Sequence, residues 1–259
     1  MVLGEEGHQS GEGRSRTNID LPGLQKELLK EIKKVNKNIV LVVMSGRPLD
    51  LTWEDENIPA IVQAWQLGSR SGDAIAQVLY GDYNPSGKLT MSFPRNVGQV
   101  PVYYNFKNTG RPSTSIEQVT NSGYADVENS PLYSFGYGLS YTEFKYSDFE
   151  ISSSTMTKDS KINASIRVTN TGNYKGEEVV QLYLRDIVGS IARPMKELKG
   201  FEKIELNPGE SKIVNFEIEN SLLEFYSYNN VWESEPGKFH VFIGTDSNVR
   251  DHKEFYLTN

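Results

Sequence analysis

Cysteine is absent from the 259 residues of this chain, which excludes disulfides, cysteine-based zinc sites, iron–sulfur clusters and a thiolate nucleophile. Long apolar runs are also missing: the longest is Ile39 to Met44, whereas a membrane-spanning helix needs about 20 apolar residues. Histidine is scarce, and the scattered positions of His8, His240 and His252 count against a histidine-rich metal site. Lys and Arg total 27 against 34 Asp and Glu, so a net charge of −7 gives no general attraction for nucleic acid or anionic lipid.

The first part of the chain alternates between strand and helix patterns. The unbroken apolar run at 39–44 predicts a strand buried on both faces, as in a parallel sheet covered by helices. Further strand candidates lie at 60–65 and 89–93. Such alternation predicts parallel βαβ units.

Two helices are expected between these strands. The first begins near Pro22, with Asp20 as a possible cap, and continues to Val35 at helical spacing. The second covers residues 72–80 and ends at Gly81. Three of its side chains are expected to be buried: Ile75, Val78 and Leu79.

From about residue 141 the pattern becomes all-β. Strand candidates lie at 162–168, 180–184, 198–204, 211–218, 238–243 and 253–257, separated by turn sequences at 170–172, 207–209 and 235–237. About seven short strands at this spacing predict an immunoglobulin-like or fibronectin type III-like sandwich. Residues from about 103 to 140 have no strong period and are expected to form a long connection along the surface.

One polar segment is a candidate for chemistry, namely GEEGHQSGEGRSRTNID at residues 4–20. Glu5, Glu6 and Glu12 supply carboxylates, while Arg14 and Arg16 supply cations. The segment follows an apparent strand and precedes a helix, and sites in open parallel sheets collect beyond the carboxyl ends of strands. A partly desolvated carboxylate there can act as general acid or base. The alternative is a solvated polar loop.

Other patterns for chemistry are weak. The glycines of this segment match neither G-x-G-x-x-G nor a Walker A sequence, and no G-x-S-x-G elbow is present. His8 is interpreted as a hydrogen-bonding loop residue rather than a base. The aromatic residues Tyr133, Phe135, Tyr137 and Tyr141 either stack on a sugar or join two domains.

Several longer motifs occur in a fixed order along the chain: GEGRSRTNIDLPG, SGRPLDL, GDYNPSGKLTMSFP, PLYSFGYGLSYTEF, KELKGFEKIELNPGE and EPGKFHVFIGTDS. From about residue 2 to 257 the sequence resembles the C-terminal part of glycoside hydrolase family 3, as in bacterial periplasmic β-glucosidases. GDYNPSGKL and FGYGLSYT in this order are the most specific of these motifs.

This resemblance implies a fold that combines α/β and all-β parts. Residues 1–112 are expected to form the C-terminal part of an α/β sandwich domain, 113–140 a connector, and 141–259 a fibronectin type III-like domain. Family members carry an N-terminal barrel with the nucleophilic aspartate, and this chain lacks that barrel. The start Val2-Leu3-Gly4 looks like the end of a buried strand, so we expect the chain to begin inside a domain, without a signal peptide. Location in the periplasm or outside the cell is implied by the resemblance alone.

The resemblance also implies site residues and a reaction. Glu12 matches the family's acid/base glutamate, and Glu5 is the runner-up with a structural role. The reaction would be retaining hydrolysis of terminal non-reducing β-glucosyl residues, with β-xylosides or arabinosides as alternatives and with no cofactor or metal. We expect Arg14 and Arg16 to point away from Glu12 and pair with other acids, and the chain alone to be inactive.

A second hypothesis makes the chain a non-catalytic module. Its sandwich would bind a sugar polymer or another protein, with Trp232 and Tyr226 as a stacking platform. The partners expected are thus an oligosaccharide or β-glucoside and the missing barrel, with neither nucleic acid nor membrane insertion.

Overall fold

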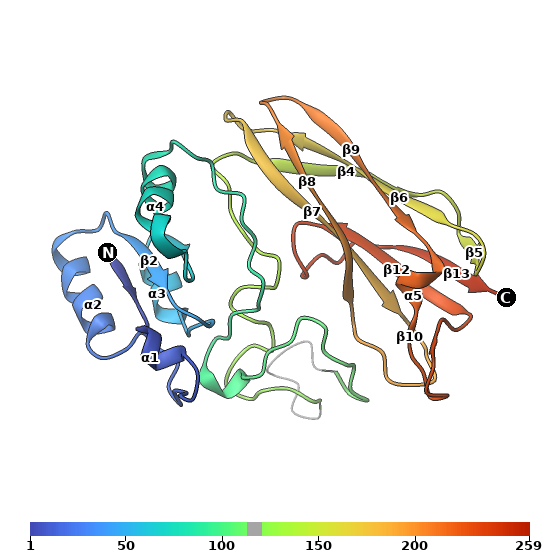
Figure 1. The fold of residues 1–259 in the computed structure, drawn as a ribbon, viewed down its shortest axis with the longest axis horizontal. Helices are drawn as coiled ribbons and strands as arrows, with labels where there is room; N and C mark the ends of the chain where they lie inside the picture. Colours follow the sequence, from blue (N-terminus) through green and yellow to red (C-terminus); the bar gives the residue numbers. More distant parts are fainter. Residues whose placement is uncertain (113–120) are drawn as a thin grey trace.

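The computed structural model describes residues 1–112 and 121–259, so residues 113–120 of the predicted connector lie outside the described part. The chain forms an α/β body and a β-sandwich that lie side by side, joined by long irregular segments (Figure 1). The α/β body contains β1 (Val2–Gly4), α1 (Gly7–Ser10), α2 (Gln25–Val35), β2 (Val40–Met44), α3 (Thr52–Asn57), β3 (Ala60–Gln63) and α4 (Ser71–Tyr80), with short 3-10 turns at Gly68–Arg70 and Val97–Gln99.

The sheet of the α/β body has three parallel strands in the order β1-β2-β3. The central strand β2 is the apolar run of the sequence, and its Leu41 and Val43 are fully buried. They pack with Leu29 of α2 and with Leu49 and Leu51 ahead of α3 in one core. The predicted strand at 39–44 and its parallel pairing are therefore confirmed.

The predicted strand at 89–93 is wrong. The backbone N–H groups of Leu89 and Phe93 donate to the carbonyls of Tyr137 and Tyr133, each at 2.8 Å. Among the described residues only an isolated antiparallel bridge between Phe93 and Tyr133 results. An irregular segment from much later in the chain satisfies these donors, so no further strand joins the sheet.

Helix boundaries and burial also differ from the prediction. Helix α2, which corresponds to the helix predicted to begin near Pro22, begins at Gln25 with Leu24 as its N-cap residue. Neither Asp20 nor Pro22 therefore begins it. Helix α4 ends as predicted at Gly81, which adopts a left-handed φ of 81°. None of the α4 side chains is fully buried, however, and Leu79 is 41% exposed. The apolar face of α4 is thus only partly covered by the described residues.

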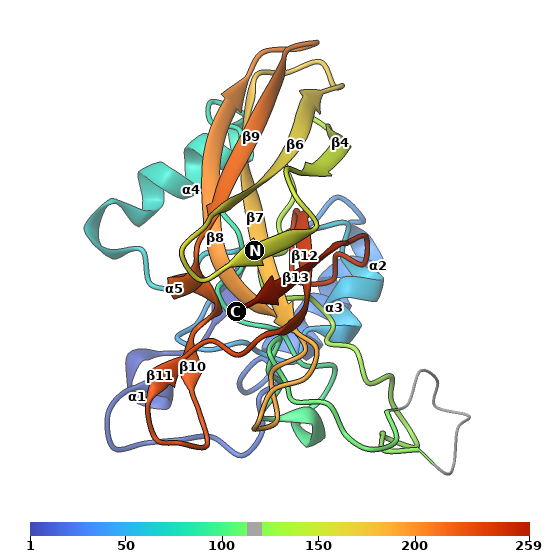
Figure 2. The same cartoon turned by 90° about the vertical axis from the view of Figure 1, so that its right-hand side faces the viewer.

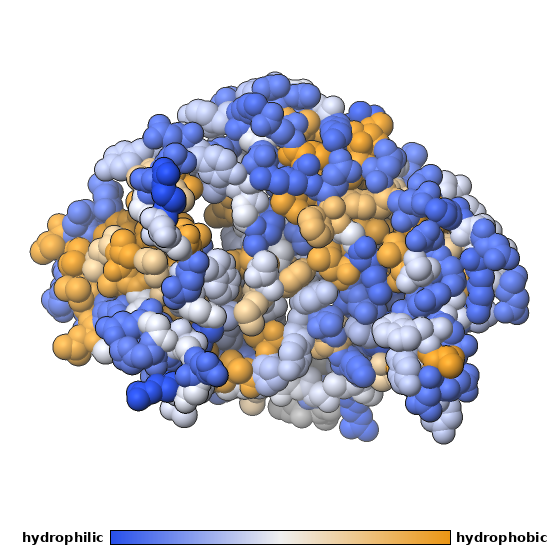
Figure 3. Space-filling model, viewed as in Figure 1, coloured by the Kyte–Doolittle hydropathy of each residue, from blue (hydrophilic) through white to orange (hydrophobic). Residues whose placement is uncertain are grey.

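A second apolar surface lies over β1 and α2, where orange side chains gather in Figure 3. Val2 is 60% exposed, Leu24 80% and Val35 86%. β1 pairs with β2 on one side and with no described strand on the other. Contiguous exposed apolar surface beside an open sheet edge is typical of a region that another segment or partner covers.

Polar contacts join the two bodies next to the turn that follows α4. The Asn84 side-chain amide donates to the Lys175 carbonyl at 2.9 Å. Lys88 Nζ lies 3.1 Å from Glu178 Oε1 in a largely buried ion pair. Because both contacts link residues about ninety positions apart, they fix the sandwich against the α/β body.

Aromatic rings fill the same junction. Tyr104 stacks on Phe135 with ring centroids 4.2 Å apart, and it contacts Tyr183 of the sandwich edge-on at 6.1 Å. The Tyr141 hydroxyl donates to the Val78 carbonyl at 2.6 Å. This packing favours the joining role over sugar stacking for the aromatic cluster.

The β-sandwich consists of a five-stranded sheet, β5-β13-β12-β7-β8, and a three-stranded sheet, β4-β6-β9 (Figure 2). Their strands are β4 (Phe144–Ile151), β5 (Thr155–Thr157), β6 (Ile162–Asn170), β7 (Gly176–Asp186), β8 (Glu197–Leu206), β9 (Ser211–Ile218), β12 (Gly237–Gly244) and β13 (Lys253–Thr258). A short helix α5 (Asn220–Leu223) precedes a small hairpin of β10 (Phe225–Tyr226) and β11 (Trp232–Glu233).

The inner faces of the two sheets share one core. Alternate residues of β6 and β7, such as Val168 and Val180, are fully buried there. Phe239 and Phe255 stack across β12 and β13 with centroids 5.3 Å apart. The six strand candidates after residue 160 all form strands, which confirms the predicted sandwich. No helix among the described residues is both long enough and apolar enough to span a bilayer.

Candidate active-site loop

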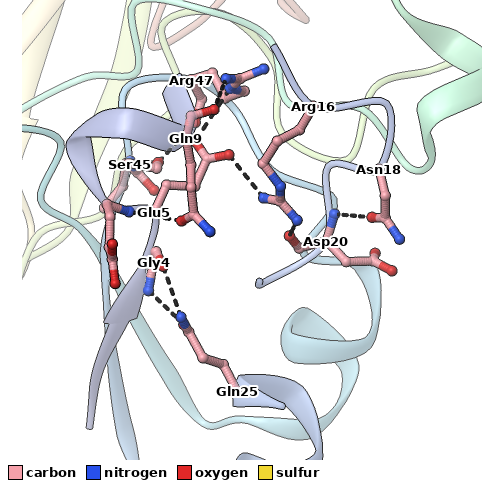
Figure 4. A network of polar contacts seen from close by, with 11 residues as sticks. Gly4, Glu5, Gln9, Arg16, Asn18, Asp20, Gln25, Ser45 and Arg47 are labelled. Atoms are coloured by element: carbon pink, nitrogen blue, oxygen red, sulfur yellow. Dashed lines mark hydrogen bonds and ion pairs between the residues drawn. The ribbon is translucent and has the colours of Figure 1, made fainter. Parts of the chain in front are cut away.

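The polar segment between β1 and α2 forms a loop at the carboxyl end of the parallel sheet (Figure 4). Gly4 adopts a φ of +144°, and a Cβ at this position would lie 1.8 Å from the Met44 carbonyl oxygen. The Gln25 amide accepts from the Gly4 N–H at 2.7 Å and donates to the Gly4 carbonyl at 2.9 Å. Only glycine fits this exit from β1, which directs the following residues over the sheet edge.

Glu5 anchors the loop from the inside. Its side chain is fully buried, and the Glu5 N–H donates to the Met44 carbonyl at 2.8 Å. Arg16 Nη1 donates to Glu5 Oε1 at 2.9 Å, and Arg47 Nε lies 3.2 Å from Glu5 Oε2. Arg16 also donates to the Asp20 carbonyl at 3.1 Å. Glu5 therefore has the hydrogen-bonding role expected of the runner-up residue.

Glu12 has the opposite surroundings. It follows the end of α1 in an exposed turn, and Gly13 after it adopts a left-handed φ of 75°. Within residues 1–112 and 121–259, no hydrogen bond or ion pair involves the Glu12 carboxyl. This carboxyl group is thus available to a ligand or to another part of the protein.

The two arginines near Glu12 differ in their contacts. As expected, neither pairs with Glu12, and Arg16 is held by Glu5. Arg14 is exposed and pairs with no acid in the described part of the chain, so its expected pairing with another acid stays a prediction. His8 lies within the short helix α1 rather than in a loop, with its Nδ1 3.1 Å from Glu6 Oε2.

A small hollow of about 220 Å³ opens beside the later part of the loop. Five of its seven lining residues have polar side chains, carboxylates and amides among them: Thr17, Asn18, Ile19, Asp20, Asp50, Asn96 and Val97. Such groups suit hydroxyl-rich ligands. The sequence indicated the loop but did not indicate that Asp50 and Asn96 would meet it.

Glu54 is a buried acid that the sequence did not single out. Its side chain is fully buried in α3, and neither carboxyl oxygen accepts a hydrogen bond from a described residue. Lys26 Nζ lies 4.0 Å from Glu54 Oε2, at the limit of an ion pair. Burial raises the pKa of the Glu54 carboxyl, and the Lys26 charge offsets this only in part.

This raised pKa predicts a pH-dependent stability. The folded chain binds the Glu54 proton more tightly than the unfolded chain, so the contribution is present at low pH and is lost as pH rises above about 4.5 through the folded pKa. We expect Glu54→Gln to match the parent in its free energy of unfolding near pH 4 and to exceed it at pH 8, where the parent must keep a buried carboxylate charged or protonated. Urea unfolding at both pH values measures this, with the exposed Glu56→Gln as control. An equal stability difference at both pH values contradicts it.

Two of the three histidines do not behave as scattered residues. The rings of His240 and His252 stack with centroids 4.1 Å apart, because strand pairing brings their segments together.

The proposed platform of Trp232 and Tyr226 is exposed, but the rings meet at 65°. A flat sugar face cannot stack on both of these rings at once.

Two protein-family models match this chain. The model of the glycosyl hydrolase family 3 C-terminal domain matches residues 1–141. The chain belongs to glycoside hydrolase family 3. A fibronectin type III-like domain matches residues 178–247 of this family 3 chain. The resemblance drawn from the sequence motifs and the predicted fold class are both confirmed.

Curated relatives of this family 3 chain include a periplasmic β-glucosidase of Salmonella typhimurium, 52% identical over 247 residues, which cover 95% of this chain and 32% of the relative. A β-xylosidase of Formosa agariphila is 42% identical and covers 100% of this chain and 35% of the relative. A crystal structure of β-glucosidase from Listeria innocua in complex with glucose superimposes with a TM-score of 0.93 at 39% identity, covering 100% of this chain and 36% of that chain. The chain thus spans about a third of the length of these proteins.

Proposed function

We propose that this chain is the C-terminal part of a retaining β-glycosidase and that Glu12 is its acid/base residue. The observation that carries the proposal is an exposed carboxylate that has no partner among the described residues. It lies on a loop at the carboxyl end of the sheet, in a chain whose relatives are named β-glucosidases and β-xylosidases. The proposal includes the domain limits 1–112, 113–140 and 141–259 and a location in the periplasm, as the name of the Salmonella relative suggests.

The proposed reaction needs two carboxylates about 5–5.5 Å apart. An aspartate on a barrel N-terminal to this chain attacks the anomeric carbon, while Glu12 donates its proton to the departing glycosidic oxygen. Glu12, now ionised, then takes a proton from water, whose oxygen attacks the anomeric carbon and releases the aspartate. The apolar surface over β1 and α2 is where we expect the preceding part of the protein to pack.

The contacts of Arg16 support the role of Glu12. Glu12 must carry a proton in the first step, and a cation within about 4–6 Å would lower its pKa. Arg16 is held instead by the buried Glu5 and the Asp20 carbonyl. The charge of Arg16 is thus paired with Glu5 rather than with Glu12.

The substrate class follows from the relatives. β-Glucosides are the first choice, since relatives named β-glucosidase include the one that is 52% identical. β-Xylosides are the alternative, because a 42% identical relative is named β-xylosidase. Arabinosides remain a third possibility within the family.

Stereochemistry and preference test this function together. The full-length enzyme, with the barrel ahead of this chain, is expected to hydrolyse an aryl β-glucoside faster than the matching β-xyloside. Proton NMR should detect β-glucose as the first product. Release of α-glucose would contradict the retaining mechanism. Faster hydrolysis of the β-xyloside would show that β-xylosides, and not β-glucosides, are the preferred substrates.

The chain by itself provides a separate prediction. Because it supplies one of the two carboxylates, we expect no hydrolysis of an aryl β-glucoside by the purified 259-residue chain. The measurement is aryl alcohol release over hours, with the full-length enzyme as positive control. Turnover that co-purifies with the isolated chain would show that it holds both catalytic groups.

A further inference from the structure

The outer face of the five-stranded sheet brings together two imidazoles and a carboxylate. His240 on β12 is directly opposite Glu254 on β13, and His252 lies just ahead of β13. Glu254 Oε1 is 3.1 Å from His240 Nε2 and 3.8 Å from His252 Nε2. One ligand atom from each of the three residues lies within 4.8 Å of the others.

Neighbouring groups prepare these atoms for ligation. His252 Nδ1 lies 3.1 Å from the Arg250 carbonyl oxygen, which only accepts hydrogen bonds, and this contact favours Nε2 as the ligand atom. Lys238 Nζ lies 2.7 Å from Glu254 Oε2, which leaves Oε1 directed at the two imidazoles. Contacts at the second nitrogen or oxygen of a ligand are usual around protein-bound metals, and the Glu254 contact with Lys238 can persist while the His252 ring turns.

We propose that His240, His252 and Glu254 form a binding site for a divalent transition-metal ion of the zinc type. Two imidazole nitrogens and one carboxylate oxygen match the ligands that Zn²⁺ takes at three of its four tetrahedral positions, with water at the fourth. Ca²⁺ and Mg²⁺ prefer oxygen ligands throughout, so this donor set selects against them.

Metal binding requires a change in the ring arrangement. The His240 and His252 rings are stacked with an angle of 16° between their planes, and an ion lies close to the plane of each imidazole that ligates it. The stack must therefore open. His252 is the side chain that can turn, because it is 36% exposed and lies outside the strands, whereas His240 is 16% exposed within β12.

Charge sets the expected strength of the site. Lys238 is paired with Glu254, and Arg185 is opposite His240 on β7, so two cations oppose a dication here. We therefore expect micromolar affinity rather than the tighter binding of a closed four-ligand zinc site. A bound ion would tie the loop ahead of β13 to β12 and β13.

The test is titration of the tag-free 259-residue chain with Zn²⁺ at pH 7.5, followed by calorimetry and by NMR of the histidine rings. We expect one ion per chain and selective shifts of the His240 and His252 ring signals. His252→Ala and Glu254→Gln should each weaken binding by more than about 10-fold. Both side chains make only surface contacts, so the circular dichroism spectrum should stay unchanged and the unfolding midpoint without metal should shift by no more than a few degrees.

The matched control is His8→Ala, which removes the third histidine and leaves the cluster complete. It should bind Zn²⁺ as the parent does, and Ca²⁺ should give no heat with either protein. The chain has no cysteine, so no thiolate competes for the ion. Absence of Zn²⁺ binding, unchanged binding in His252→Ala, or loss of binding in His8→Ala would each overturn the proposal.

Discussion

Glu12→Ala in the full-length enzyme, or in a chimera with a family 3 barrel ahead of Met1, is expected to lower kcat/KM on a methyl β-glucoside by about 10²–10⁴-fold. The reason is that an alkoxide leaves poorly unless a proton reaches its oxygen. A dinitrophenyl glucoside needs little protonation, so its first step should proceed and the glycosyl-enzyme should accumulate. Azide can then attack the anomeric carbon without losing a proton, and we expect it to restore turnover with a β-glucosyl azide as product.

The control for Glu12 lies in the same loop. Glu6 is exposed and pairs with His8 at 3.1 Å, so Glu6→Ala should leave kcat/KM within about 2-fold of the parent on both substrates. Full activity of Glu12→Ala on the methyl glucoside would remove Glu12 from the mechanism. An equal loss in Glu6→Ala would show that loop structure, rather than proton transfer, limits the rate.

The sequence predicted some elements well because their physical signal is local. Six consecutive apolar residues at 39–44 are typical of a central strand in a sheet that is covered on both faces. Alternation along β6 likewise predicts a half-buried strand from its own residues. The glycines and acidic residues around Glu12 likewise indicated a candidate site from the local sequence alone.

The failures have long-range causes. Residues 89–93 have strand composition, yet their backbone donors pair with an irregular segment some forty positions later. The apolar face of α4 lacks a complete cover within the described residues, so its periodicity predicted burial that does not occur there. Glu54 is charged and lies in a short polar helix, and only tertiary packing buries it. His240 and His252 meet only through the register of β12 and β13, which spacing along the chain does not reveal.

Glu5→Ala is expected to destabilise the 259-residue chain by on the order of 3 kcal/mol. The substitution leaves Arg16 and Arg47, which are only 20% and 23% exposed, without their shared carboxylate. The partial exposure of the two guanidinium groups places the effect at the lower end of the range for a broken buried pair. Urea unfolding at pH 7 measures it, and Glu12→Ala is the matched control because it removes an exposed carboxylate that pairs with none of residues 1–112 and 121–259.

The same pair of variants separates anchoring from catalysis. Glu12→Ala should lose activity at full stability, whereas Glu5→Gln should keep the fold better than Glu5→Ala but release the charge of Arg16. If the freed Arg16 guanidinium comes within about 4–6 Å of the Glu12 carboxyl, it lowers the pKa of the general acid, which must be protonated to work. The alkaline limb of the kcat/KM profile should therefore move to lower pH in Glu5→Gln, and a second substitution, Arg16→Met, should move it back. An unmoved limb would mean that Glu5 supports the loop without controlling the charge around Glu12.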